Sequence, residues 1–254
     1  MSQEAKNERR KDGKKGRKGM SVIRDYVCID LETTGLSPKA DRIIEIGAAR
    51  VREGRIVATF QQLINPRMEL KERIVELTGI EARELTGQPE LSEVLPELEE
   101  FLGEDILVGH RISFDYSFLK RAFVNQKKEF EKQGLDTLRI ARACVNDCES
   151  KKLESLCKHF GITHQAHRAL GDVLATAELY EKLLEAYTEE KKEIFLPKPL
   201  IYKVKKESPV TRAQLEQLER VIMKYAVQPS VELASLTRNE ASRYLDQLYS
   251  TYGR

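Results

Sequence analysis

The stretch YVCIDLETTGL, residues 26–36, decides the fold. Tyr26 to Ile29 form a short apolar run of the kind that is buried in a sheet, yet the run ends in Asp30 and Glu32. Side chains two residues apart on a strand point to the same face, so the two carboxylates project together. Like charges at that spacing are unfavourable unless a cation lies between them. The stretch predicts a buried strand that ends in a cation site, or else an exposed strand end with two solvated acids.

The segments that follow this strand read first as strands and then as strand–helix units. Residues 42–52 and 55–64 are two further expected strands, with Glu53 and Gly54 between them as a tight hairpin connection. Further strands are expected at 105–110 and 134–138, and helices at 91–103, 114–126, 152–162 and 168–186. Antiparallel strands followed by βα units predict an α/β fold, a mixed sheet covered by helices.

Composition indicates a globular protein of a reducing compartment. The 254 residues are 41% hydrophobic and 33% charged, which is ordinary for a soluble domain. No apolar run approaches the roughly 18 residues of a spanning helix, and the N-terminus lacks the apolar core of a secretory signal. The spacings of Cys144, Cys148 and Cys157, with His159, match no strong zinc signature, so free thiols are expected. We expect a cytoplasmic location and no membrane partner.

The two ends of the chain differ from its body. Residues 1–22 are rich in lysine and arginine and lack apolar periodicity, so they are expected to be a disordered basic arm, either a polyanion contact at low salt or a solubilising tail. Residues 191–210 contain prolines and are expected to form a linker.

Residues 211–254 are expected to form a small helical segment. Thr211 with Gln214, and Thr237 with Glu240, are possible capping boxes ahead of two short amphipathic helices. Two such helices have little core of their own, so their apolar faces need burial. The segment is interpreted as a docking or nucleic-acid-contact element, with a structural appendage as the alternative.

More acids and a histidine occur at the junctions of later strands and helices. Asp115 lies where one strand has just ended and a helix begins. His167 comes just before the last long helix of the body, and Asp172 lies near its first turns, away from the apolar stripe. Each alone has an ordinary explanation, since an acid near a helix N-terminus is favourable.

Together these motifs carry a family resemblance. DLETTGL, RIIEIGAARV, the pattern GHxxxFD and HRALGD occur in register over roughly residues 24–186. In this order they resemble the DEDD exonucleases, and specifically the subgroup with H-x-x-x-x-D spacing, the DnaQ-like family that includes proofreading exonucleases such as the DNA polymerase III epsilon type. The resemblance implies an exonuclease domain at 23–190 with the ribonuclease H-like fold, a mixed five-stranded sheet flanked by helices.

The resemblance also implies the roles of the catalytic residues. Asp30 would contact both of two Mg²⁺ or Mn²⁺ ions, Glu32 and Asp172 would complete the site of one ion, and Asp115 would support the other. Carboxylate oxygens suit these hard cations. His167 would be the general base, because an imidazole titrates near neutral pH. The remaining candidates His159 and His164 lack a paired carboxylate motif and are expected to be packed or exposed histidines.

A third implication concerns the substrate. Gly35 permits close backbone approach to a terminal nucleotide, Leu36 can press on its base, and His110 matches a position that supports the site. Arg111 departs from the family, which commonly has Asn at this position. The polar contact of that Asn is therefore not expected here, and the arginine could bind a phosphate instead. A simple turn is the alternative for residues 33–36. The implied substrate contacts are Thr33, Thr34, Gly35, Leu36, His110, Arg111 and Phe114.

The predicted function is 3′-5′ exonuclease action on DNA. The substrate would be single-stranded or frayed 3′ ends, the reaction two-metal-ion phosphodiester hydrolysis, and the setting proofreading or repair, with a DNA polymerase subunit as a partner. The motifs do not distinguish DNA from RNA substrates, so a 3′-5′ exoribonuclease acting on RNA is one alternative. The other alternative is a catalytically silent nucleic-acid-binding module on the same fold.

Overall fold

A computed structural model of the protein describes residues 22–164, 166–204, 208–229 and 231–253, so the predicted basic arm falls almost entirely outside the described residues. The strands are β1 (Tyr26–Thr33), β2 (Ile43–Arg52), β3 (Arg55–Leu63), β4 (Leu107–Gly109), β5 (Gln133–Asp136) and β6 (Lys198–Pro199). The helices are α1 (Glu72–Thr78), α2 (Ala82–Leu85), α3 (Leu91–Leu102), α4 (Ile112–Asn125), α5 (Thr137–Cys144), α6 (Leu153–Phe160), α7 (Ala169–Lys191), η1 (Lys192–Phe195), α8 (Arg212–Tyr225), η2 (Leu233–Ser235) and α9 (Arg238–Tyr252).

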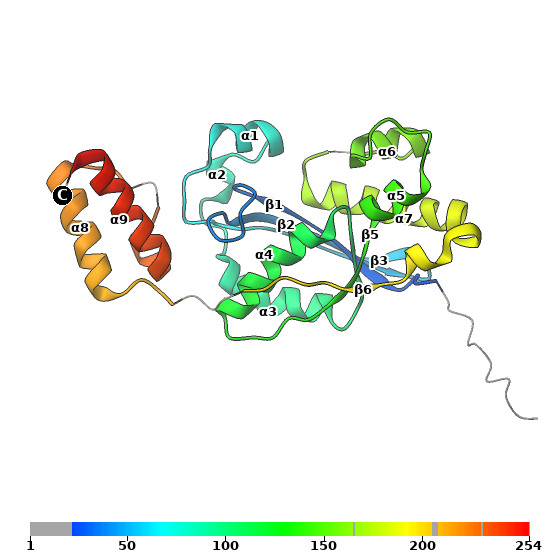
Figure 1. Ribbon diagram of the computed structural model, residues 1–254, viewed down its shortest axis with the longest axis horizontal. Helices are drawn as coiled ribbons and strands as arrows, with labels where there is room; N and C mark the ends of the chain where they lie inside the picture. The colour runs from blue at the N-terminus through cyan, green and yellow to red at the C-terminus, as the bar shows by residue number, and fades with distance from the viewer. Residues whose placement is uncertain (1–21, 165, 205–207, 230, 254) are drawn as a thin grey trace, which may run out of the picture.

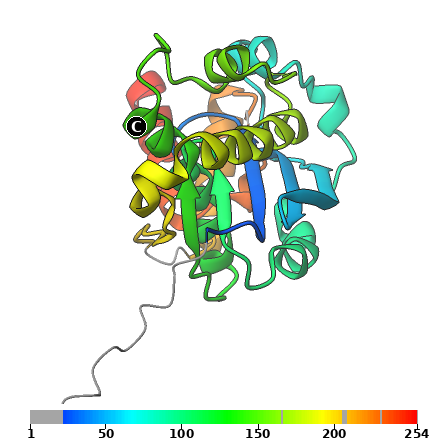
Figure 2. The same cartoon turned by 90° about the vertical axis from the view of Figure 1, so that its right-hand side faces the viewer.

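A mixed sheet forms the centre of the body (Figures 1 and 2). Its order over the described residues is β3-β2-β1-β4-β5-β6. The pairs β1·β2, β2·β3 and β5·β6 are antiparallel, whereas β1·β4 and β4·β5 are parallel. The predicted α/β class, with antiparallel strands followed by βα units, is confirmed, and the fold is ribonuclease H-like.

The sheet has six strands in the described residues instead of the five expected. The extra strand, β6, lies within the range expected to be a linker, and it pairs with β5 at Gln133 and Gly134. Just before it, the Phe195 side chain is 1% exposed in the core. The sequence gives no strand signal there because β6 is only two residues long and one of them is Pro199.

Helices cover both faces of the sheet. On one face, α7 crosses the strands and packs with α5 and α6 over the side chains of Tyr26 and Cys28 (Figure 2). On the other face, α3 and α4 cover Val27, Ile29 and Leu31. The alternation of these residues is the period of a strand buried on both sides. Although α7 is long, no helix of the described part of the chain has the length and apolar character needed to cross a bilayer.

The end of β1 is open on one side. β1 pairs with β4 as far as Cys28 and then runs past it. Beyond that point the backbone N–H of Leu31 donates to the carboxylate of Asp115 on α4, at 3.1 Å. Asp30 and Glu32 continue the alternation on the α7 face. A notch therefore forms at the carboxyl ends of the parallel strands, where open α/β sheets bind ligands.

The first turn of α7 lies directly on β2. A Cβ atom added at Gly47 would lie 2.4 Å from the backbone carbon of Ala169 and 2.5 Å from the backbone nitrogen of Leu170. Real Cβ atoms do not approach backbone this closely, so the helix reaches its position only because residue 47 has no side chain. This contact sets the distance between α7 and β1.

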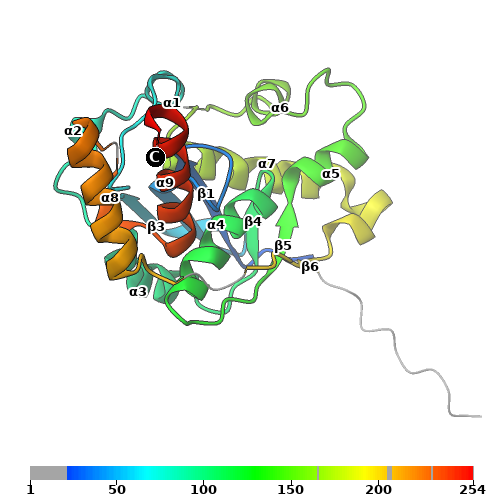
Figure 3. The same cartoon turned by 60° about the vertical axis from the view of Figure 1, so that its left-hand side comes forward.

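The two C-terminal helices pack against each other at one end of the molecule (Figures 1 and 3). Both predicted capping boxes are confirmed: Thr211 with Gln214 opens α8, and Thr237 with Glu240 opens α9. The pair has its own core cluster, in which the buried members are Leu218, Val221, Leu236, Ala241, Leu245 and Leu248. The apolar faces predicted from the sequence therefore bury each other.

The contact of Gly47 with α7 leads to the first prediction. Gly47→Ala should lower the free energy of unfolding by about 1–3 kcal/mol, the usual cost of overpacking, because the added methyl group has no space. Urea denaturation followed by circular dichroism measures the change. The control Thr59→Ala, at an exposed position of β3, should change stability by no more than about 0.5 kcal/mol. Equal stability of Gly47→Ala and the wild type would contradict the close approach.

Candidate active site

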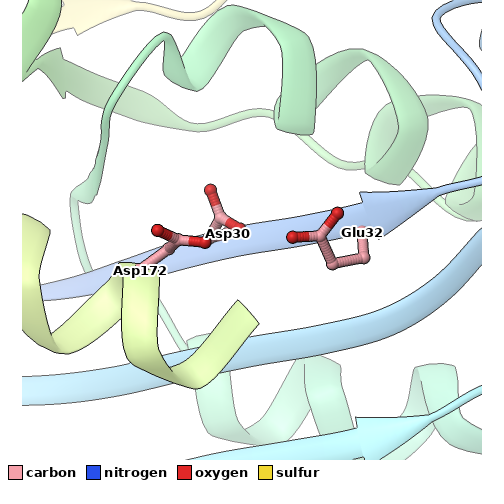
Figure 4. Close-up of side chains that lie close together, drawn as sticks. All are labelled: Asp30, Glu32 and Asp172. Carbon is pink, nitrogen blue, oxygen red and sulfur yellow. The ribbon is translucent and has the colours of Figure 1, made fainter. Parts of the chain in front are cut away.

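Three carboxylates meet at the end of β1 (Figure 4). Asp30 and Glu32 come from β1, and Asp172 comes from the first turn of α7. One oxygen from each of the three lies within 4.8 Å of the others, which is the spacing that a bound metal ion requires. Residues far apart in the sequence thus form one acidic cluster.

The cluster opens into a cavity of about 200 Å³. Asp115 lies at its floor and is 3% exposed. The residues lining it are Asp30, Leu31, Glu32, Leu36, His110, Arg111, Phe114, Asp115 and Asp172. Of the predicted site residues, Thr33, Thr34, Gly35 and His167 are not among these lining residues.

Burial and mutual repulsion make the charged forms of the acids in the cluster unfavourable. Burial, together with the charges of Asp115 and Asp172, raises the pKa of Asp30 well above its ordinary value. Burial and the nearby charges of Asp172 and Glu45 raise the pKa of Glu32 to about 8. Burial also raises the pKa of Asp115. Oxygen-only donors held together in this way fit a hard divalent cation such as Mg²⁺ or Mn²⁺.

A further acid, Glu45, fixes the start of α7. It is 0% exposed, on β2 directly opposite Glu32. Its carboxylate accepts hydrogen bonds from the guanidinium of Arg168 at 3.0 and 3.3 Å and from the backbone N–H of Ala169 at 3.0 Å. The side chain of Gln61 donates to it from β3 at 2.8 Å. Sequence reasoning did not assign Glu45 a role, although a single acid inside the apolar run of β2 is a signal of a buried partner.

The structure brings a second histidine to Asp172. The His164 side chain, 7% exposed, places its Nε2 atom 2.5 Å from Oδ1 of Asp172. His167 contacts the same carboxylate through its backbone N–H, which donates to Oδ2 at 3.0 Å, while its side chain is exposed. His164 is thus a packed histidine, and although the sequence shows no paired carboxylate motif for it, the structure gives it a carboxylate partner. No sequence pattern links the two residues, because the contact depends on the path of the loop before α7.

Backbone and histidine contacts fix the wall opposite α7. The Nε2 atom of His110 lies 2.9 Å from the carbonyl oxygen of Lys151, and its Nδ1 atom lies 2.9 Å from the hydroxyl of Thr137. A carbonyl oxygen only accepts, so Nε2 carries the proton. Burial lowers the pKa of His110, which favours this neutral form. Arg111 has a φ of 77°, and its backbone N–H donates to Asp136 at 3.0 Å.

The segment Thr33–Leu36 follows the two acids of β1, and of its residues Leu36 lines the cavity. The hydroxyl of Thr33 donates to the carbonyl oxygen of Gly35 at 2.7 Å. Gly35 is enclosed, because an added Cβ atom would lie 2.6 Å from the carboxylate of Asp41. Leu36, in contrast, is 77% exposed. The segment thus presents one apolar side chain from a rigid backbone.

Comparison with known proteins gives the same family from the sequence. Residues 27–180 match the RNase_T family model, described as exonuclease. The DNA polymerase III subunit epsilon of Aquifex aeolicus is 39% identical over 162 residues, which are 63% of this chain and 80% of that protein. The PolC-type DNA polymerase III of Clostridium perfringens is 39% identical over 167 residues, 65% of this chain. The match spans only 12% of the length of that relative.

Solved structures share the fold. The structure of E. coli exonuclease I in complex with a dT13 oligonucleotide superposes with a TM-score of 0.60 and 22% identity, covering 67% of this chain and 43% of that one. Exonuclease X in complex with 5′ overhanging duplex DNA superposes with a TM-score of 0.55 and 24% identity, covering 67% of this chain and 99% of that one. At this level of identity the likeness concerns the fold.

The raised pKa of Glu32 leads to the second prediction. In EDTA, the protein should lose stability as pH rises from 4.5 to about 8, because the folded state holds a proton that the unfolded state releases. Glu32→Gln cannot ionise, so its melting temperature should fall less between pH 5 and pH 9. The two falls should differ by at least about 2–4 °C, which corresponds to roughly 1 kcal/mol in a chain of this size.

Melting curves followed by circular dichroism at both pH values measure this difference. The control Glu76→Gln, an exposed glutamate of α1, should follow the wild type. If Glu32→Gln and the wild type lose the same number of degrees, the pKa of Glu32 is not raised.

Proposed function

The chain belongs to the RNase_T exonuclease family, and on that basis we propose that it removes nucleotides from the 3′ ends of DNA by phosphodiester hydrolysis. The observation that carries the proposal is the cluster of Asp30, Glu32 and Asp172 within 4.8 Å, beside Asp115 in one cavity. A catalytically silent binding module would not need four acids in one cavity, where burial and mutual repulsion make their charged forms unfavourable. The proposed substrates are single-stranded or frayed ends.

Divalent cations are part of the proposal. Asp30, Glu32 and Asp172 would hold one Mg²⁺ or Mn²⁺ ion, and Asp30 with Asp115 would hold a second. When bound, such ions supply Lewis-acid stabilisation of the charge that develops on the phosphate oxygens. The donor set supports this assignment, because carboxylate oxygens with raised pKa values gain their counter-charge from the ions.

The protein's own residues would hold and orient the 3′ end. Leu36 and Phe114 both line the cavity and would contact the terminal base. The backbone of the 33–36 segment would lie against the terminal sugar, held in place by the close packing of Gly35 on the Asp41 carboxylate. The Arg111 guanidinium lies 5.8 Å from the Phe114 ring centroid, beside the acids, where it would meet a phosphate of the bound strand.

The two histidines that contact Asp172 would have different roles. His167 would accept the proton of the attacking water, because its side chain is exposed to solvent and its backbone N–H donates to the Asp172 carboxylate at 3.0 Å. His164 would act as a positioning residue, because its contact at 2.5 Å orients the Asp172 carboxylate.

The names of the relatives support DNA and a replicative setting. Two of them are DNA polymerase III components, and both of the structures named above contain DNA. We therefore include in the proposal a cytoplasmic proofreading or repair role with a DNA polymerase subunit as a partner. The proposed organisation is an exonuclease domain at 23–190, a connecting segment at 191–210 that also adds β6 and Phe195 to the body, and a helical segment at 211–254.

Digestion of end-labelled oligonucleotides tests the function and gives the third prediction. With Mg²⁺, a 5′-labelled DNA strand should shorten stepwise and a 3′-labelled strand should lose its label as mononucleotide at once, whereas a circular single strand should survive. EDTA should stop both reactions. Asp30→Asn should lower the rate by at least about 10³, since several kcal/mol of transition-state stabilisation are lost. The exposed acid Asp246 provides a matched control, and Asp246→Asn should keep the wild-type rate.

The same assay separates the alternatives. Faster digestion of a matched RNA strand would make the protein an exoribonuclease. Rapid cutting of circles would overturn the exonuclease assignment. If the protein binds the oligonucleotide but does not hydrolyse it at any metal concentration, it is a catalytically silent nucleic-acid-binding module.

The division of labour between the histidines is the fourth prediction. His167→Ala should lower kcat by about 10² to 10⁴, the usual range for loss of a general base. His164→Ala should mainly raise the Mg²⁺ concentration needed for half-maximal rate, by about tenfold, because it disturbs the orientation of one ligand. His159→Ala is the control, since His159 pairs with Asp147 at 3.5 Å outside the cavity. A greater loss of kcat in His164→Ala than in His167→Ala, at saturating Mg²⁺, would reverse the two roles.

A further inference from the structure

An ion pair joins the C-terminal helices to the exonuclease body. The guanidinium of Arg42, just before β2, lies 2.7 Å from the carboxylate of Glu240 in the first turn of α9. The two side chains are 30% and 10% exposed, so the pair is largely shielded from solvent. Figure 3 shows α9 beside the body, with α8 next to it.

Arg42 is also tied to the segment that would hold the 3′ end. The backbone N–H of Thr34 donates to the carbonyl oxygen of Arg42 at 2.8 Å. In return, the backbone N–H of Arg42 donates to the hydroxyl of Thr34 at 2.9 Å. The position of Thr34 therefore follows that of Arg42, whose side chain is fixed by Glu240.

A second contact between the helical pair and the body reaches the same threonine. Met68 forms an isolated β-bridge with Val231, in the connection between α8 and α9. Beside it, the backbone N–H of Glu232 donates to the carbonyl oxygen of Arg67 at 3.3 Å. The hydroxyl of Thr34 lies 3.7 Å from the sulfur of Met68. Two independent contacts of the helical pair thus converge on Thr34.

The helical pair is suited to act as a preformed support. Its core cluster consists of residues between Val210 and Tyr249, so α8 and α9 bury their apolar faces in each other. The contacts with the body described above are polar. Glu240 has two functions in this arrangement, because it also closes the capping box of α9 by accepting from the backbone N–H of Thr237 at 2.8 Å. Burial opposes its charge, but Arg42 and Thr237 outweigh burial, and the pKa of Glu240 is lowered.

We propose that Glu240 is a positioning residue for 3′-end binding, and that it acts through Arg42 on Thr34. The C-terminal helices then support the site that receives the terminal nucleotide of a DNA strand, and they are not an independent appendage. This inference rests on the proposed function, since it takes the 33–36 segment as the place where the 3′ terminus binds. The cation cluster has no part in it.

Steady-state kinetics on a short single-stranded DNA test the proposal, and they give the fifth prediction. Glu240→Gln keeps a side chain that can close the capping box but removes the charge. It should raise KM about fivefold, the factor expected for losing a shielded ion pair, and leave kcat within about twofold. Arg42→Met should do the same, and the double variant should be no worse than either single variant, because both remove one interaction.

The matched control is Glu216→Gln, which removes a charge from the same helical pair. Glu216 pairs with Arg212 at 2.8 Å on the exposed face of α8. Its KM should equal that of the wild type. An unchanged KM in Glu240→Gln, or additive effects in the double variant, would overturn the proposal.

Hydrogen exchange gives a readout that does not need activity. In Glu240→Gln, peptides covering residues 33–42 should exchange their amide protons faster than in the wild type or in Glu216→Gln. If the wild type shows no nuclease activity but this exchange difference is present, the proposed function fails and the support of Thr34 by Glu240 stands. If the wild type is active and the exchange difference is absent, the support fails and the proposed function stands.

Discussion

The mutual repulsion of carboxylates at the end of β1 is the constraint on which the rest of the structure depends. Asp30, Glu32 and Asp172 lie within 4.8 Å of one another, although burial and proximity make their charged forms unfavourable. Only a rigid frame can hold them there. That frame is the close approach of α7 to Gly47 and the hydrogen bonds that Glu45 accepts from the start of α7. Gly47 and Glu45 both lie on β2, and every residue of β1 pairs with β2.

Glu45 differs from the acids of the cavity in having a guanidinium partner. Glu45 is the most deeply buried acid near the site, but its carboxylate meets the guanidinium of Arg168 in a two-point contact. Because Arg168 is engaged with Glu45, the acids in the cavity keep an excess of negative charge. A buried pair of this kind contributes mainly by fixing geometry, whereas in our proposal the acids of the cavity would bind the cations.

The sequence predicted the structural features that depend on residues close together in the chain. The alternation in β1, the strand–helix units and the two capping boxes each depend on residues close together in the chain, and all are confirmed. Contacts between distant segments left no such signal. β6 is too short to show periodicity, the contact of His164 with Asp172 depends on a loop path, and the ion pair of Arg42 with Glu240 joins residues 198 positions apart.

Two separate networks thus support the two tasks of the site. The cluster of acids is held by β1, β2 and the start of α7, through Gly47 and Glu45. The 33–36 segment is held by Arg42 and Met68, which reach the C-terminal helices. The networks meet at β1, which carries Asp30 and Glu32 and leads directly into Thr34, and at β2, which begins directly after Arg42 and carries Glu45 and Gly47. In our proposal, a change in the second network would therefore alter how the 3′ end is received while the acids keep their positions, since the frame of the acids lies entirely within the exonuclease body.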